Sequence, residues 1–217
     1  MLNLNVTPIL IFDGAKLQMK EHTEEERRKN RELHKAKAEQ YLAEGNYVMA
    51  QKMFAIAVDI TSEMAYELVQ AVKTMNVQCI VAPYEADAQL AFLYHQQLAS
   101  VVITEDSDLL CFGVKRCFFK MDLDGNGDEV DLDHLQEAKE LNFRSFDLEM
   151  LLITCVLSGC DYLESIKGIG FKKAHKLVYE NGSDYQQIFK KIRREGKFIV
   201  PRDYERDFVK ALVTFKF

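Results

Sequence analysis

Acidic residues at the ends of apolar runs are the most distinctive feature of this 217-residue sequence. Asp13 follows the run PILIF, and the pair Asp106 and Asp108 follows SVVIT. In a parallel α/β sheet, ligand sites form at the carboxyl ends of the strands, so we expect such acids to line one site. Six acids have a setting of this kind: Asp13, Glu85, Asp87, Asp106, Asp108 and Asp161.

The spacing of the paired acids limits how they share a ligand. Asp106 and Asp108 are two residues apart, so an extended backbone directs both to one side. Glu85 and Asp87 would lie about 200° apart in a regular helix, so they share a site only at its first turn. The alternative is that each acid caps a helix or lies in a solvated loop.

The donor set also indicates which ion would bind. Hard carboxylate oxygens, with no His or Cys among them, select Mg²⁺ or Mn²⁺. Four or more crowded carboxylates repel one another unless cations lie among them. The six acids therefore predict two ions about 3.5–4 Å apart, an arrangement that hydrolyses phosphodiesters.

Basic residues next to the first acid form a second candidate group. Lys20, Arg27 and Arg28 lie in a segment rich in both charges, which we predict to be an exposed, projecting helix over 16–45. Lys20 and Arg27 are seven residues apart and would share a helix face, from which cations can stabilise a phosphate in the transition state. The alternative is a solvated helix with surface salt bridges.

A glycine-bearing segment, SGCDYLESIKGIGFKKAHKL (158–177), follows the last of the six acids. Gly168 and Gly170 permit a close backbone approach, and Lys172 and Lys173 begin the next helix, whose dipole favours phosphate. A plain helical hairpin is the alternative. Further along, the basic stripe 190–194 is first of all explained as a solvated face, with extended duplex contact or a weak nuclear address as the alternatives.

Composition excludes several classes of protein. The formal net charge is −6 and the sequence pI is about 5.5, so any nucleic-acid role needs local basic faces. The five cysteines form no CxxC pair and are expected to be free thiols of a reducing compartment. No apolar run reaches the roughly 18–20 residues that a membrane span needs, and we expect no membrane association.

Strand and helix patterns alternate as far as Leu132, which predicts an α/β fold with a mainly parallel central sheet. We expect one amphipathic helix over 47–75 to pack on the core, and small residues over 41–57 to let two helices pack closely. The expected strands are 8–12, 77–81, 100–104, 114–121 and 129–131. The expected further helices are 84–96, 134–141, 146–158, 171–180, 184–194 and 203–215.

The run DLDGNGDEVDLD (122–133) partly fits a calcium-binding EF-hand loop. Position twelve of that loop is Asp133, where a bidentate Glu is required, and the preceding CFFKM is typical of a strand. An Asn-Gly turn between two strands explains the same residues. We therefore expect a β-hairpin here, with a calcium sensor as the weaker alternative.

Five motifs in order resemble those of the structure-specific 5′ nucleases, the flap endonuclease or XPG-like superfamily. They are FDG, VAPYEADAQLAFL, ITEDSDLLCFG, KMDLDGNGDEVD and LSGCDYLESIKGIGFKKA. The resemblance covers essentially the whole chain and implies one PIN-like nuclease domain over 1–217. Within it, 14–46 would be a helical arch, 77–133 the sheet core with the acidic site, and 146–180 a helix–two-turn–helix.

The resemblance implies Mg²⁺-dependent hydrolysis of DNA from 5′ ends and nicks and at 5′ flaps, in mismatch repair and end resection in the nucleus. The six acids match the family's ligands for two ions, with Mn²⁺ as a substitute, and Asp13 and Asp106 would serve catalysis directly. Lys20 and Arg27 match its phosphate clamps. The expected DNA contacts are Arg28, Gly168, Gly170, Lys172 and Lys173, and the expected K⁺ ligands are Ser158, Ser165 and Ile169.

The sequence departs from the family pattern at both ends. The family opens with a strand that carries another metal Asp and with a wedge helix, so we expect an N-terminally truncated form. The family's tail for repair-protein partners is likewise expected to be absent. An alternative function is therefore a catalytically impaired form that binds DNA structures without cutting them.

Overall fold

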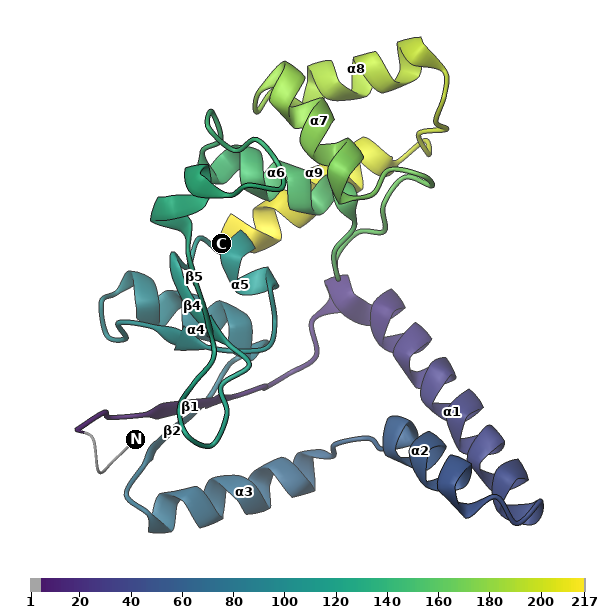
Figure 1. Ribbon diagram of the computed structural model, residues 1–217, viewed down its shortest axis with the longest axis vertical. Helices are drawn as coiled ribbons and strands as arrows, with labels where there is room; N and C mark the ends of the chain where they lie inside the picture. The colour runs from purple at the N-terminus through teal and green to yellow at the C-terminus, as the bar shows by residue number, and fades with distance from the viewer. Residues whose placement is uncertain (1–4, 217) are drawn as a thin grey trace. The chain divides into compact units, whose positions relative to one another are not determined.

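The computed structural model describes residues 5–216, and the chain divides into two compact units, Met1–Ala86 and Asp87–Phe217 (Figure 1). The segment predicted to be the arch lies in the first unit. The predicted helix–two-turn–helix lies in the second. Each unit combines helices with a small sheet, which confirms the α/β class.

The first unit is built on a parallel strand pair. Strand β1 (Ile9–Phe12) is the predicted PILIF strand, and it pairs with β2 (Gln78–Val81) from Ile9 opposite Gln78 to Phe12 opposite Val81. The backbone N–H of Ala82 continues the ladder by donating to the carbonyl of Phe12 at 2.8 Å. Because the strands run in the same direction, both leave the sheet at the same edge.

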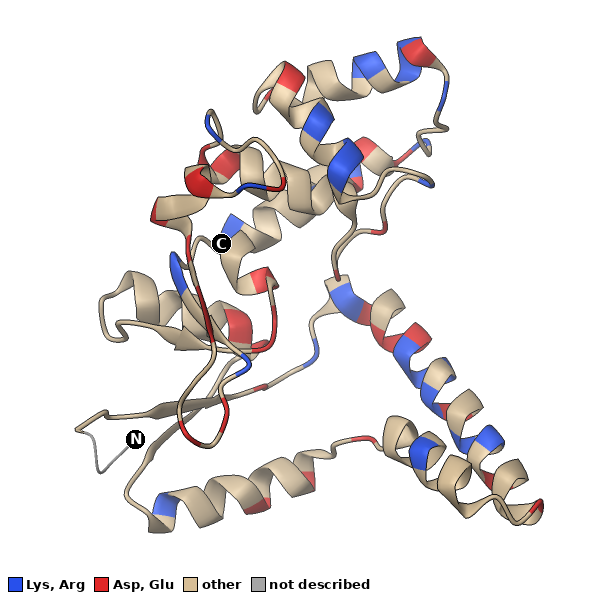
Figure 2. Cartoon of the chain, viewed as in Figure 1, with Lys and Arg blue, Asp and Glu red and all other residues tan. Residues whose placement is uncertain are grey.

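A helical hairpin follows β1. A 3-10 turn (Gln18–Lys20) leads into α1 (Glu21–Ala43), which is almost entirely exposed, as predicted for a projecting helix. Helix α2 (Tyr47–Ala57) packs against α1 through the small buried residues Ala38 and Ala50. The expected close packing of two helices is therefore confirmed, and charges of both signs alternate along α1 (Figure 2).

The single helix expected over 47–75 is wrong. The chain breaks at Val58, whose backbone is extended, and restarts as α3 (Ser62–Thr74). Thr61 caps the new helix, its Oγ1 accepting a hydrogen bond from the N–H of Met64 at 3.3 Å. Short polar side chains compete with helical hydrogen bonding, which explains the break at this point. The expected packing on the core is also wrong. Among the described residues of α3, Val69 is the one that is buried, whereas Met64 and Leu68 are more than half exposed.

The second unit holds a small mixed sheet. Helix α4 (Ala86–His95) leads to β3 (Val102–Ile103), which runs parallel to β4 (Arg116–Phe119). Strand β4 then pairs antiparallel with β5 (Asp128–Asp131), as the predicted hairpin requires. A single turn of helix, α5 (Asp108–Cys111), lies between β3 and β4.

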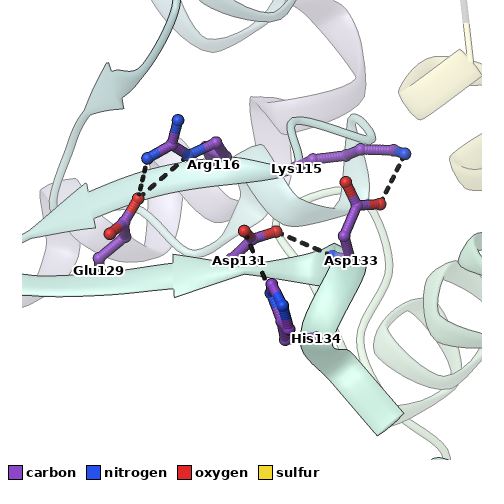
Figure 3. A network of polar contacts seen from close by, with 6 residues as sticks. All are labelled: Lys115, Arg116, Glu129, Asp131, Asp133 and His134. Carbon is purple, nitrogen blue, oxygen red and sulfur yellow. Dashed lines mark hydrogen bonds and ion pairs between the residues drawn. The ribbon is translucent and has the colours of Figure 1, made fainter.

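Ion pairs line the exposed face of this hairpin (Figure 3). The guanidinium of Arg116 contacts Glu129 Oε1 at 2.6 and 3.1 Å, across the two strands. Lys115 Nζ lies 2.7 Å from Asp133 Oδ1, and Asp131 Oδ1 accepts from the N–H of Asp133. Cross-strand charge pairs of this kind help to set the register of the hairpin.

The calcium-loop alternative is not supported by this geometry. Oδ1 of Asp122 accepts hydrogen bonds from the N–H groups of Asp124 and Asn126, at 2.9 and 2.8 Å. Hydrogen bonds from Asn126 lower the pKa of Asp122. The segment is flanked by β4 and β5, whereas an EF-hand needs helices on both sides. Asp122 therefore stabilises a hairpin turn.

Helices complete the second unit, and four of the five predicted after β5 are confirmed within two residues. The exception is 134–141, where a 3-10 helix (Leu132–Glu137) forms instead. The remaining helices are α6 (Leu148–Ser158), α7 (Phe171–Asn181), α8 (Tyr185–Glu195) and α9 (Tyr204–Lys216). Helix α6 is buried along most of its length, and Phe189 of α8 meets Phe208 of α9 edge to face. Across residues 5–216, no helix is long and apolar enough to cross a membrane.

Candidate functional site

The first predicted acid, Asp13, lies directly after β1. Its Oδ1 accepts a hydrogen bond of 2.8 Å from the N–H of Ala86, the first residue of α4. A carboxylate at a helix N-terminus is favoured by the helix dipole. One oxygen of Asp13 thus has the capping role that we considered as the alternative to metal binding.

Gly14 allows the chain to bring Asp13 to this place. Its N–H donates to the carbonyl of Tyr84 at 2.6 Å, and a Cβ at this position would lie 1.8 Å from the carbonyl oxygen of Ala82. No side chain fits at that distance, so the FDG motif needs glycine for a close backbone approach. The contact holds the end of β1 against the loop that carries Glu85.

Lys20 and Glu85 form an ion pair in the first unit. Lys20 Nζ lies 2.5 Å from Glu85 Oε1, and the two side chains are only 11% and 14% exposed. The predicted phosphate clamp is therefore paired with a predicted metal ligand. This contact joins the start of the arch to the loop after β2, and sequence spacing did not predict it.

Lys20 ends the 3-10 turn and is the N-cap of α1, which begins at Glu21, so Lys20 lies at the end of the helix that carries Arg27. Arg27 is half exposed and lies 3.6 Å from Glu24. Arg28 lies 4.0 Å from Glu32 and lines a hollow of about 480 Å³ at the base of α1.

In the second unit, Asp106 and Asp108 lie in a tight turn. Asp106 Oδ1 accepts from the N–H of Asp108 at 2.9 Å, and its own N–H donates to Thr104 Oγ1 at 3.0 Å. Ser107 between them has helical dihedrals, so the extended backbone expected here is wrong. The second oxygen of Asp106 accepts no hydrogen bond from the residues that the structure describes.

Asp161 and Asp108 approach one thiol. Burial raises the pKa of Cys160 to about 11, and the negative charges of Asp108 and Asp161 add to the rise. Both carboxylates therefore lie within electrostatic range of Cys160, although 53 residues separate them along the chain. Asp87 lies in the first turn of α4 and is half-buried.

The acids of the second unit are not fully gathered. Within this part of the described chain, no three of them offer oxygens that all lie within 4.8 Å of one another. The four are Asp87, Asp106, Asp108 and Asp161. Like charges come closer than this only when cations or protons compensate them.

The glycine-bearing segment forms two turns between α6 and α7. Cys160 and Leu163 exchange backbone hydrogen bonds in a short antiparallel bridge, and Ser158 Oγ donates to the carbonyl of Cys155. Gly168 has a φ of +91°, which favours glycine, and it precedes the buried Ile169. The structure thus contains the predicted helix, turns and second helix.

The two predicted lysines of this segment differ in their surroundings. Lys172 is exposed in the first turn of α7. Lys173 Nζ donates to the carbonyl of Gly168 at 2.6 Å and lies 5.0 Å from the ring centroid of Phe198. Lys173 therefore braces the turn, whereas Lys172 points its charge to solvent.

Two residues with positioning roles had no signal in our sequence analysis. Glu105 Oε1 accepts from the N–H of Lys120, a residue with a positive φ, and so ties the acidic turn to the end of β4. Phe198 lies against Gly168 and Lys173 from a loop 30 residues away in sequence. Long-range contacts of this kind leave no local pattern in a sequence.

Comparison with known proteins places these features in a class. Residues 76–161 match the XPG I-region family. Over 99% of its length the chain is 45% identical to Exonuclease 1 of Danio rerio, of which it covers 27%. It is 44% identical to Exonuclease 1 of Oryza sativa, of which it covers 25%. The chain spans about a quarter of the length of these relatives.

Solved structures share the fold. The catalytic core of Rad2 in complex with a DNA substrate superposes with a TM-score of 0.65 at 18% identity, covering 99% of this chain and 66% of that one. The Holliday junction-resolving enzyme GEN1, in complex with product DNA, Mg²⁺ and Mn²⁺, gives 0.56 at 18% identity over 72% of this chain and 42% of that one. The chain therefore has the PIN-like α/β fold of these structures.

Over nearly its whole length the chain is thus similar in sequence to the exonuclease 1 proteins, and it shares its fold with the catalytic core of Rad2.

Proposed function

We propose that the chain carries the nuclease chemistry of the exonuclease 1 proteins, hydrolysing DNA phosphodiesters from 5′ ends and nicks and cutting 5′ flaps. The observation that carries the proposal is the similarity to exonuclease 1 over nearly the whole chain. The acids after β1, at the start of α4, after β3 and after α6 add the chemistry that such a reaction needs. We also propose that the chain acts in DNA repair in the nucleus, together with repair-protein partners.

The six acids are proposed to hold two divalent ions, Mg²⁺ with Mn²⁺ as a substitute. The donor set fits hard cations, because all its members offer carboxylate oxygens. Asp13 and Asp106 each use one oxygen for a backbone N–H, and the second oxygen of each accepts nothing from the described residues. When bound, such ions lower the pKa of an attacking water and stabilise the leaving oxygen.

Lys20 is proposed to move from Glu85 to the scissile phosphate. In the ion pair its charge is compensated by Glu85, and both side chains are largely shielded from water. A cation on the other side of Glu85 would weaken this pair and free Lys20 to donate to a phosphate oxygen. Arg27, half exposed on α1, is proposed as the second phosphate donor and Arg28 as a DNA contact.

The two turns before α7 are proposed to grip the backbone of duplex DNA. Gly168 and Gly170 permit close approach, and the exposed Lys172 lies at the N-terminus of α7, where the dipole also favours phosphate. Lys173 would act by bracing the carbonyl of Gly168. Ser158, Ser165 and Ile169 are the proposed ligands of a monovalent cation such as K⁺ in this turn.

Cleavage of a labelled substrate tests the nuclease proposal. We expect the chain with Mg²⁺ to release the 5′-labelled flap from a flap duplex, and Asp106→Ala to reduce the rate at least about 100-fold through lost transition-state stabilisation. Asp124→Ala, an exposed acid of the β4–β5 turn, is the matched control and should retain the rate. Equal rates for the two variants would contradict the assignment of Asp106.

A second candidate is a protein that binds DNA structures without cutting them. It is favoured by the incomplete gathering of the acids in the second unit, where the two turns before α7 are fully formed. The same substrate separates the candidates. Binding in a gel-shift assay, with no Mg²⁺-dependent product, would support the second candidate and contradict the first.

A further inference from the structure

We propose that the outer face of α8 is a second binding site for the phosphate backbone of duplex DNA, separate from the turns before α7. The inference rests on the proposed DNA binding of this chain and extends it to a surface that contains none of the residues named there. The site is a hollow of about 500 Å³ along α8, lined entirely by polar and charged side chains.

The sequence of α8 separates its two faces. Ile188, Phe189 and Ile192 are at most 1% exposed and fix the inner side of the helix against the core. The opposite side presents Gln186, Lys190 and Arg194, which are four residues apart and therefore lie above one another on one face. Figure 2 shows the basic residues of α8 in its C-terminal half.

Two of the four basic residues on α8 are compensated and two are not. Lys191 pairs with Glu180, and Arg193 pairs with Glu205. Lys190 and Arg194 make no ion pair with any of the described residues. Both line the hollow and are exposed, so their charges are available to an anion from solution.

The single acid of the lining does not cancel these charges. Asp184 is the N-cap of α8, and its Oδ1 accepts from the N–H of Gln187 at 3.0 Å. Asp184 therefore stabilises the start of the helix, ten residues before Arg194 and six before Lys190. The end of the hollow that holds Lys190 and Arg194 is consequently positive.

The remaining lining residues suit a phosphate backbone. Asn181, Gln186 and Gln187 carry carboxamides, which both donate and accept and are common partners of phosphate and sugar oxygens. Lys190 and Arg194 are about 6 Å apart along the helix axis, whereas phosphates of one strand follow at about 3.4 Å along the duplex axis. The two cations would thus contact different phosphates, without reading base sequence.

The position of the hollow sets the length of DNA required. Helix α8 packs on α7, and Asn181 at the end of α7 lies nine residues beyond Lys172, about 14 Å along the helix. That distance corresponds to roughly four base pairs of duplex. A duplex that ends near the turns before α7 would miss α8, and a longer one would reach it.

Fluorescence anisotropy with a hairpin duplex of about 4 base pairs and a duplex of about 24 base pairs tests this proposal. For the long duplex, we expect Lys190→Ala/Arg194→Ala to weaken binding about tenfold and to lower the slope of log K against log salt by about 2, since each phosphate contact contributes about 0.9. The short duplex should bind equally to the variant and to the unmodified chain. The matched control is Arg206→Ala/Lys210→Ala on α9, which removes two exposed charges elsewhere.

The outcomes separate this proposal from the proposed function. Lys172→Ala should weaken binding of both duplexes, because it acts at the turns before α7. If Lys172→Ala does so while the α8 variant keeps the salt slope of the unmodified chain, the α8 site is wrong and the DNA-binding proposal stands. If the unmodified chain binds neither duplex, both are wrong. An unchanged slope together with lost nuclear import of a fluorescent fusion would assign the stripe to transport and overturn the α8 site.

Discussion

The two units of the chain bury very different side chains. Among the described residues, the buried apolar side chains of the first unit are all small: Ala38, Ala50, Val69 and Ala82. The second unit buries large ones, including Phe189, Phe208 and Leu109, with aromatic rings in edge-to-face contact. Because the free energy of burial scales with apolar area, the second unit has far more to hold it together.

The first unit is held instead by a few specific contacts. The Asp13–Ala86 hydrogen bond, the close approach of Gly14 to Ala82 and the Lys20–Glu85 ion pair join its elements. At the same time Tyr47, Val48, Ile60 and Tyr66 are more than 60% exposed. Candidate site residues of this unit are therefore held in place by local contacts more than by a buried core.

The largest expected effect tests the core of the second unit. Phe208 is fully buried against Phe189, so Phe208→Ala should reduce the free energy of unfolding by about 3–5 kcal/mol. Phe54→Ala on α2, where the side chain is 36% exposed, should cost less than about 1 kcal/mol. Urea unfolding of both variants measures the difference. Similar losses in the free energy of unfolding for the two variants would contradict the difference in buried apolar core between the units.

The next effect tests the contacts of the first unit. Gly14→Ala places a Cβ against the backbone of Ala82 and should reduce the free energy of unfolding of this unit by about 1–3 kcal/mol. Hydrogen exchange at the β1–β2 pair should accelerate, while exchange in α6 stays slow. Gly170→Ala is the control, because its Cβ would meet nothing within 4 Å. Unchanged exchange in β1–β2 would show that the close approach is not needed.

A pH dependence should appear in the second unit. Burial raises the pKa values of Cys117 and Cys160 to about 11, from 9.0 in the free thiol. Above pH 9 the unfolded chain loses these protons first, so the free energy of unfolding should fall between about pH 9 and 11, by roughly 1–2 kcal/mol. Chemical denaturation at stepped pH measures this fall. Cys160→Ala should reduce the fall by about half, because Cys117 remains, and Cys79→Ala in β2 should leave it unchanged. An equal slope in both would exclude Cys160 as its cause.

The smallest effect concerns the ion pairs of the hairpin. Arg116 and Glu129 are about half exposed, so Arg116→Ala should change the free energy of unfolding by less than about 1 kcal/mol, and less still in high salt. Thermal unfolding at low and high ionic strength measures this. A loss as large as that of Phe208→Ala would mean that the second unit is held by charge and not by its apolar core.

Local patterns were sufficient for much of the architecture. PILIF predicts β1, the Asn-Gly turn predicts the β4–β5 hairpin, and the amphipathic runs predict α6 to α9 within two residues, because each follows from neighbouring side chains. The family resemblance likewise required only the ordered motifs. Errors arose where competing local signals were close in strength, as at Val58–Thr61, where capping by Thr61 ended a helix that periodicity alone would continue.

By itself, the sequence determined the class of fold, the similarity to the exonuclease 1 proteins and the identity of the acids, since these depend on residue type and order. Tertiary structure decided how those acids are used: Asp13 caps α4, Lys20 pairs with Glu85, Asp108 and Asp161 approach Cys160, and Lys190 and Arg194 are left uncompensated on α8. The reason is physical. Pairing, burial and compensation of charge depend on distances between residues far apart in the chain, and no local pattern specifies them.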